Sequence, residues 1–312
     1  MHDRRSCHAL EPFPDWRCSD GMTTRTIIRV LMFGLLLSLP ASAAPASAEL
    51  RPSVVSSRPM ETIAGGATGS WRVQRTGTTT QIRRTSGATT WSTSVPKQFG
   101  LPVVTSRGLR AGPTLDGSAI ALAAEPKRIG TSWSSTFVVV AKTSMNTVSM
   151  PGQWAYDAIS PDGATLFLIE SVGGGRYWVR SVDAGTGRLG ERLVTKTVSF
   201  DPATTTVEDG PMEGLALDRL ASTDGRTVFT LYDGPSHPFV HALNIAEGWA
   251  LCYDLPGDLR ARAAVLHLRR GPAEGTVNVV SEGAIVAQIT TSGTRWGPSV
   301  RVAGTDRPPV NS

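Results

Sequence analysis

A chain of 312 residues with 40% hydrophobic and only 18% charged side chains can bury a core, which excludes an intrinsically disordered protein. Its 32 glycines and 21 prolines, with recurrent Thr, Ser and Val, argue against a helical bundle and favour many short strands joined by tight turns. The net charge of +5 comes mostly from scattered basic residues, without the basic stripe and interleaved aromatics of a nucleic-acid-binding protein. We therefore expect no nucleic-acid partner.

The first 48 residues have the pattern of an export signal. Val30–Leu39 is an apolar run of ten residues that follows two arginines and precedes two small-residue A-x-A sites. This pattern predicts a secretory signal peptide over 22–48, since a transmembrane helix needs about 20 apolar residues. The polar residues 1–21 are predicted to be a disordered upstream extension before Met22. The protein is then secreted or associated with the cell envelope, and it touches the membrane only if the signal segment stays uncleaved.

Removing residues 1–48 leaves a predicted domain over 49–312 with Cys252 as its single cysteine. No intramolecular disulfide is then available, so the hydrophobic core must stabilise the exported domain alone. Because Cys252 lies in an apolar stretch, we predict that it is a buried small hydrophobic residue.

A recurrent unit of strand, Asp-Gly turn and strand organises the predicted domain. In the clearest copy, Tyr156–Gly163 ends in Ser-Pro-Asp-Gly and is followed by the apolar run Ala-Thr-Leu-Phe-Leu-Ile. Pro, Asp and Gly at these positions favour a tight turn between antiparallel strands. The turn aspartates Asp116, Asp162 and Asp224 recur at spacings of 46 and 62 residues. Because propeller blades repeat at about 40–50 residues, we predict a single β-propeller of about six to seven four-stranded blades. A β-sandwich or other all-β fold is the alternative.

The same stretches resemble a known group of repeats. Ser160-Pro-Asp-Gly163 with its following Leu-Phe-Leu-Ile, and the later Val-Asp183-Ala-Gly-Thr-Gly-Arg, are similar to the blade signatures of bacterial YVTN-type, TolB-like and WD40-like β-propellers. More narrowly, residues 133–290 resemble uncharacterised exported bacterial propeller-like proteins. The resemblance implies a propeller fold and an exported location, and it assigns no catalytic residues.

Five polar residues are candidates for the loops around the channel of a propeller: Asp157, Asp183, Asp233, His237 and His241. Two carboxylates facing each other there could act on a glycosidic bond, but the sequence selects no pair. The two histidines, four residues apart on a strand, would lie about 13 Å apart, too far to share one metal ion. Asp162 and Asp224 are better explained as turn formers. We predict no catalytic constellation, no metal site and no cofactor.

These observations favour a non-enzymatic binding or protein-interaction scaffold, because propellers present a rigid face of loops and fold alone does not specify chemistry. The expected partners are an envelope protein or an extracellular glycan, and the expected state is a monomer. The alternative function is a secreted hydrolase or lyase that acts on a glycan or a lactone at the central channel.

Overall fold

The computed structural model describes residues 60–65, 68–96, 99–194, 210–290 and 299–302. All of them belong to one compact unit, Ala46–Ser312. The predicted extension and signal peptide lie outside the described residues. Within the described ranges, no helix has the length and apolar character needed to cross a membrane.

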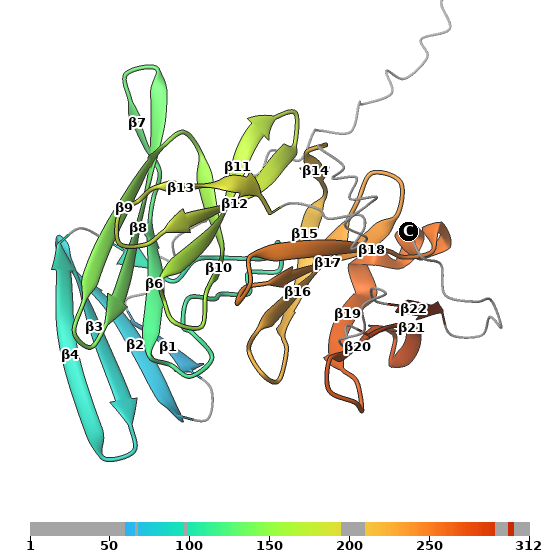
Figure 1. The fold of residues 1–312 in the computed structure, drawn as a ribbon, viewed down its shortest axis with the longest axis horizontal. Coiled ribbons are helices and arrows are strands. Elements are labelled where there is room, and N and C mark those ends of the chain that lie inside the picture. Colours follow the sequence, from blue (N-terminus) through green and yellow to red (C-terminus); the bar gives the residue numbers. More distant parts are fainter. Residues whose placement is uncertain (1–59, 66–67, 97–98, 195–209, 291–298, 303–312) are drawn as a thin grey trace, which may run out of the picture. The chain divides into compact units, whose positions relative to one another are not determined.

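The described residues form five antiparallel sheets that follow one another along the chain (Figure 1). The first sheet, in the order β1-β2-β3-β4, contains β1 Met60–Gly65, β2 Gly69–Thr76, β3 Thr79–Ser86 and β4 Thr89–Pro96. The second contains β5 Phe99–Gly100, β6 Ala119–Ala124 and β8 Ser132–Ala141, with β7 Lys127–Ile129 and β9 Met145–Pro151 both paired to β8.

The third sheet contains β10 Trp154–Ile159, β11 Thr165–Gly173, β12 Arg176–Asp183 and β13 Leu189–Leu193, and β14 Met212–Glu213 also pairs with β12. The fourth contains β15 Leu215–Ala221, β16 Thr227–Asp233, β17 Pro238–Asn244 and β18 Trp249–Asp254. A 3-10 helix, η2 Gly257–Val265, leads to the fifth sheet of β19 Leu266–Arg270, β20 Thr276–Ser281, β21 Ala284–Thr290 and β22 Ser299–Val302.

Consecutive sheets pack face to face, because central strands are apolar on both faces. In β6, Ile120 and Leu122 join the core cluster shared with the first sheet, whereas Ala121 and Ala123 join the cluster shared with the third sheet. Successive side chains of a strand point to opposite faces, so an unbroken apolar run serves two interfaces at once. The strands β16 and β17 divide their side chains in the same way between the third and fifth sheets.

Successive antiparallel sheets of four or five strands packed in this way have the blade arrangement of a β-propeller, and the predicted all-β fold class is confirmed. Within the described ranges there are five sheets, compared with the six to seven blades expected from the repeat spacing. The second sheet departs most from the repeat, because its first strand β5 has two residues and is followed by the irregular segment 101–118. This segment forms isolated β-bridges at Val103–Arg110 and Pro113–Ile120.

Candidate functional site

Three turns share one hydrogen-bonding scheme. After β10, the Ser160 hydroxyl donates to Asp162 Oδ1 at 2.5 Å and accepts from the Thr165 amide at 2.8 Å, while the Ala164 amide donates to Asp162 Oδ1 at 3.0 Å. The same three bonds recur around Ser222 and Asp224 and around Thr114 and Asp116. The Ser160 hydroxyl and the Ala164 amide hold the pKa of Asp162 below its ordinary value. The prediction that Asp162 and Asp224 form turns is confirmed.

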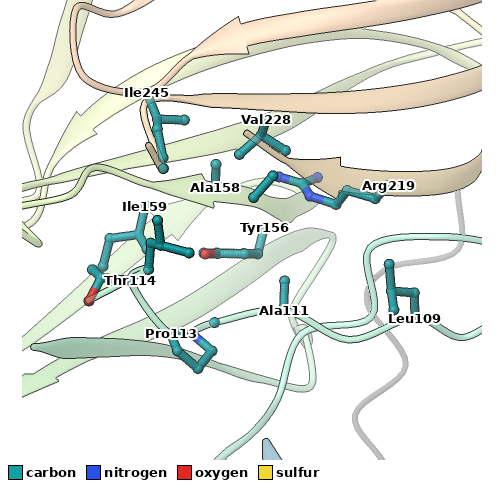
Figure 2. Close-up of a pocket in the computed structure, with 14 residues that line it drawn as sticks. Leu109, Ala111, Pro113, Thr114, Tyr156, Ala158, Ile159, Arg219, Val228 and Ile245 are labelled. Carbon is teal, nitrogen blue, oxygen red and sulfur yellow. The ribbon is translucent and has the colours of Figure 1, made fainter. Parts of the chain in front are cut away.

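The segments that precede these three turns line a cavity of about 240 Å³. Its wall consists mainly of residues 109–115, of Tyr156, Ala158 and Ile159 in β10, and of Arg219 in β15. Figure 2 shows the Tyr156 side chain in this cavity, with its hydroxyl directed toward Ile159. The cavity is called the Tyr156 cavity below. It is mostly apolar and lies where three copies of the repeat meet.

A buried ion pair lies beside the cavity. A register shift between β10 and β11 places Asp157 at a β-bulge, a feature that re-aims a side chain. Arg219 Nη1 lies 2.7 Å from Asp157 Oδ1, and the two side chains are 7% and 2% exposed. Arg219 Nη2 also donates to the Asp157 carbonyl at 2.5 Å, and Nη1 lies 3.4 Å from the Thr230 hydroxyl. The two charges therefore compensate each other within the protein.

Stacked aromatic rings lie near the carboxylate of this pair. The rings of Tyr177 and Tyr232 are 5.9 Å apart, and that of Tyr232 lies 5.0 Å from Phe239. His241 meets Tyr232 edge-on at 6.4 Å and is buried in β17. Burial raises the pKa of both Tyr177 and Tyr232, and the nearby Asp157 carboxylate adds to the rise. These phenols stay protonated at physiological pH, so this region is a structural core rather than a source of bases.

The hairpin between Val103 and Arg110 connects the second sheet to the fourth and fifth. The Ser106 amide donates to the Ala216 carbonyl in β15 at 2.8 Å. Arg107 donates to the carbonyls of Ala264 at 2.7 Å and of Leu266 at 2.8 Å, at the end of η2. These bonds satisfy carbonyls that a helix end leaves without internal partners. Because residues 109–115 form one side of the Tyr156 cavity, this hairpin supports that wall.

A carboxylate of β15, that of Asp218, stabilises the next sheet. Asp218 Oδ2 accepts a hydrogen bond from the Leu268 amide of β19 at 2.8 Å and lies 3.4 Å from His267 Nδ1. The imidazole of His267 is largely exposed. Asp218 thus ties the first strands of the fourth and fifth sheets together.

The five residues predicted from sequence fall into three separate places. Asp157 and His241 lie in the buried region around Tyr232. Asp183 is exposed in the turn after β12, where its carboxylate accepts from the Thr186 amide at 2.7 Å. Asp233 and His237 lie at the hairpin end between β16 and β17, where His237 Nε2 is 3.1 Å from Asp254 Oδ1.

Among the described residues, no group of three or more His, Cys, Asp or Glu side chains is arranged to hold a metal ion. Cys252 is half-buried rather than buried as predicted, and it packs against the apolar core between the third and fourth sheets.

Sequence reasoning missed Tyr156 and Arg219, the two polar residues that define the site. A signal for Arg219 was present, because Asp157 and Arg219 each stand three residues before the first serine of their Ser-x-Asp-Gly turns. Superimposing the repeats would have placed the opposite charges at equivalent positions of consecutive sheets.

No family model matches this sequence, and no curated protein matches it. Among solved structures, TolB from Acinetobacter baumannii is similar over 78% of this chain and 52% of its own, with 12% identity and a TM-score of 0.38. A prolyl endopeptidase is similar over 79% of this chain and 37% of its own, with 13% identity and a TM-score of 0.42. The periplasmic gluconolactonase of Pseudomonas aeruginosa is similar over 78% of this chain and 67% of its own, with 14% identity and a TM-score of 0.33. This chain spans about half the length of that TolB and 37% of the endopeptidase, and likeness at this level carries no functional argument.

Proposed function

We propose that this chain is an exported binding module, which recognises its ligand through the surface around the Tyr156 cavity and carries out no covalent chemistry on it. The observation that carries the proposal is the Asp157–Arg219 pair. Arg219, the charged residue of the described cavity wall, is buried and bound to Asp157, so this pair stabilises the packing of consecutive sheets instead of facing a substrate.

The hydrolase alternative requires a different arrangement. A glycosidase places two carboxyl groups about 5–10 Å apart on either side of the bond to be cleaved. The described wall of the Tyr156 cavity contains no carboxylate, and the candidate carboxylates are divided between a buried ion pair, an exposed turn and a hairpin end. A cavity of about 240 Å³ is also smaller than the pockets of about 300–1,000 Å³ that enclose larger ligands.

The exported location rests on the signal-peptide pattern over 22–48. A binding module in that compartment meets small molecules from the surroundings and from the envelope. A rigid domain of packed sheets suits this task, because a pre-formed site loses little conformational entropy when its ligand binds.

The experiment combines binding with a search for turnover. The full chain is mixed with a panel of small uncharged molecules that includes aryl glycosides and lactones, and binding is followed by saturation-transfer NMR. We expect saturation transfer to some members of the panel and recovery of every member unchanged. Turnover of any panel member by the full chain would contradict the proposal.

A further inference from the structure

The Tyr156 hydroxyl has no hydrogen-bond partner among the described residues and is accessible from the cavity. Tyr156 is 3% exposed, and its ring lies in the core between the second and third sheets. Figure 2 shows this hydroxyl directed toward Ile159 in the cavity wall. A phenolic O–H that no protein group engages can donate to, or accept from, a molecule that enters the cavity. This hydroxyl is thus positioned to bond with a molecule that enters the cavity.

The protonation state of Tyr156 determines which group it recognises. Burial raises the pKa of Tyr156 above its ordinary value, and this effect outweighs the opposing charge of the Arg219 guanidinium. The phenol therefore remains protonated and offers an O–H donor at physiological pH. A hydrogen-bond acceptor is the complementary group on a ligand.

The size of the cavity limits the ligand to a small molecule. Apolar cavities of about 150 Å³ accept benzene, so a cavity of about 240 Å³ has room for one ring with a short substituent. The side chains of Ile159, Val228 and Ile245 make much of the wall apolar. An oligosaccharide would not fit within this volume.

The electrostatics of the wall favour an uncharged ligand. Arg219 is the charged residue of the described wall, and its guanidinium is compensated by Asp157 at 2.7 Å and also bonds the Asp157 carbonyl. An anion would have to leave water without gaining a free cation, and a cation would lie near an existing guanidinium.

From this geometry we propose that the Tyr156 cavity binds a small uncharged molecule with an apolar body of about one ring and a single hydrogen-bond acceptor, which accepts from the Tyr156 hydroxyl. The proposal rests on the proposed binding function and names the ligand class of that site.

Three probes of similar size test separately the need for an acceptor and the need for an uncharged ligand. Acetophenone has a carbonyl acceptor, ethylbenzene has none, and benzoate carries a charge. Their affinities for the full chain are measured by ligand-observed NMR. We expect acetophenone to bind about three- to tenfold more tightly than ethylbenzene, the range of one hydrogen bond, and benzoate to bind most weakly. Tyr156→Phe should remove the preference for acetophenone and retain ethylbenzene, which shows that the cavity of this variant is intact.

A second pair of variants tests the location. Ala111→Leu adds volume to the half-buried wall of the cavity and should weaken both neutral probes at least fivefold. Ala284→Leu makes the same change at an exposed position of β21 and should leave both affinities unchanged.

The outcomes separate this inference from the broader function. Equal affinities for acetophenone and ethylbenzene, a preference that survives Tyr156→Phe, or no binding of any of the three probes would overturn the ligand class. The binding function would still stand if other members of the wider panel bound and were recovered unchanged. Turnover of a panel member would overturn the binding function itself.

Discussion

The buried pair of Asp157 and Arg219 predicts a large and strongly coupled effect on stability. Arg219→Met removes a guanidinium that bonds the Asp157 carboxylate, the Asp157 carbonyl and the Thr230 hydroxyl. The carboxylate left behind is 2% exposed, and its Oδ2 already has no hydrogen-bond partner in the described part of the chain. Leaving such a charge unpaired costs about 3–5 kcal/mol, so we expect a loss of that size in the free energy of unfolding.

The double variant distinguishes a coupled pair from two independent residues. Replacing both charges by apolar side chains, as in Asp157→Leu with Arg219→Met, leaves no buried charge and often costs little. We expect the double variant to be at least as stable as Arg219→Met alone, with a coupling energy of about 2 kcal/mol or more between the two positions.

Urea unfolding of the full chain, followed by tryptophan fluorescence, measures the four corners of this cycle. The exposed pair of Arg226 and Glu247, at 2.8 Å, is the matched control, and its cycle should give a coupling of at most about 1 kcal/mol. The reasoning fails if Arg219→Met costs less than about 1 kcal/mol, or if the two single losses simply add in the double variant.

Three further predictions concern the turns and the hairpin. Gly225 has a positive φ of 70°, and a Cβ added there would lie 2.5 Å from Leu115 Cδ2, whereas Gly87 has φ 55° and open space around it. In urea unfolding we therefore expect Gly225→Ala to lower the free energy of unfolding by about 2 kcal/mol and Gly87→Ala by about 1 kcal/mol. Equal losses would show that the contact with Leu115 is irrelevant. Because hydrogen bonds lower the pKa of Asp162, its ionised form stabilises the fold above pH 3.8, and this contribution disappears as the pH falls through the lowered value. Acid unfolding of Asp162→Asn should therefore show a smaller loss of stability between pH 5 and 2, with an unchanged profile as the contrary result. Arg107→Met should speed amide hydrogen exchange in η2 without changing exchange in β2–β4. Exchange in η2 at the same rate as in the unmodified chain would rule out a capping role for Arg107.

Much of the fold follows from local patterns in the sequence. The turn at Ser160-Pro-Asp-Gly163 depends on hydrogen bonds within six residues, so its composition alone predicts it. The apolar runs of β6 and β16 likewise indicate strands buried on both faces. The segment 101–118 could not be predicted, because its conformation depends on bonds to Ala216 and to the end of η2, more than 100 residues away.

The site was predicted only in part, for a related reason. Asp157 was recognised as a candidate, but its role depends on Arg219, which lies 62 residues later and meets it only when consecutive sheets pack. Asp183 was placed among the same candidates, although its bonds to Thr186 show a turn aspartate. Tyr156 resembled any strand aromatic, since its unpaired hydroxyl becomes evident only from the surrounding cavity.

The most direct test of the account locates a bound probe on the full chain. Intermolecular nuclear Overhauser effects are measured between acetophenone and the labelled methyl groups of isoleucine. The account predicts contacts to Ile159 and Ile245, which line the Tyr156 cavity, and none to Ile129 and Ile285, which are 68% and 48% exposed. Contacts to the exposed isoleucines, or none to Ile159 and Ile245 at saturating acetophenone, would contradict it.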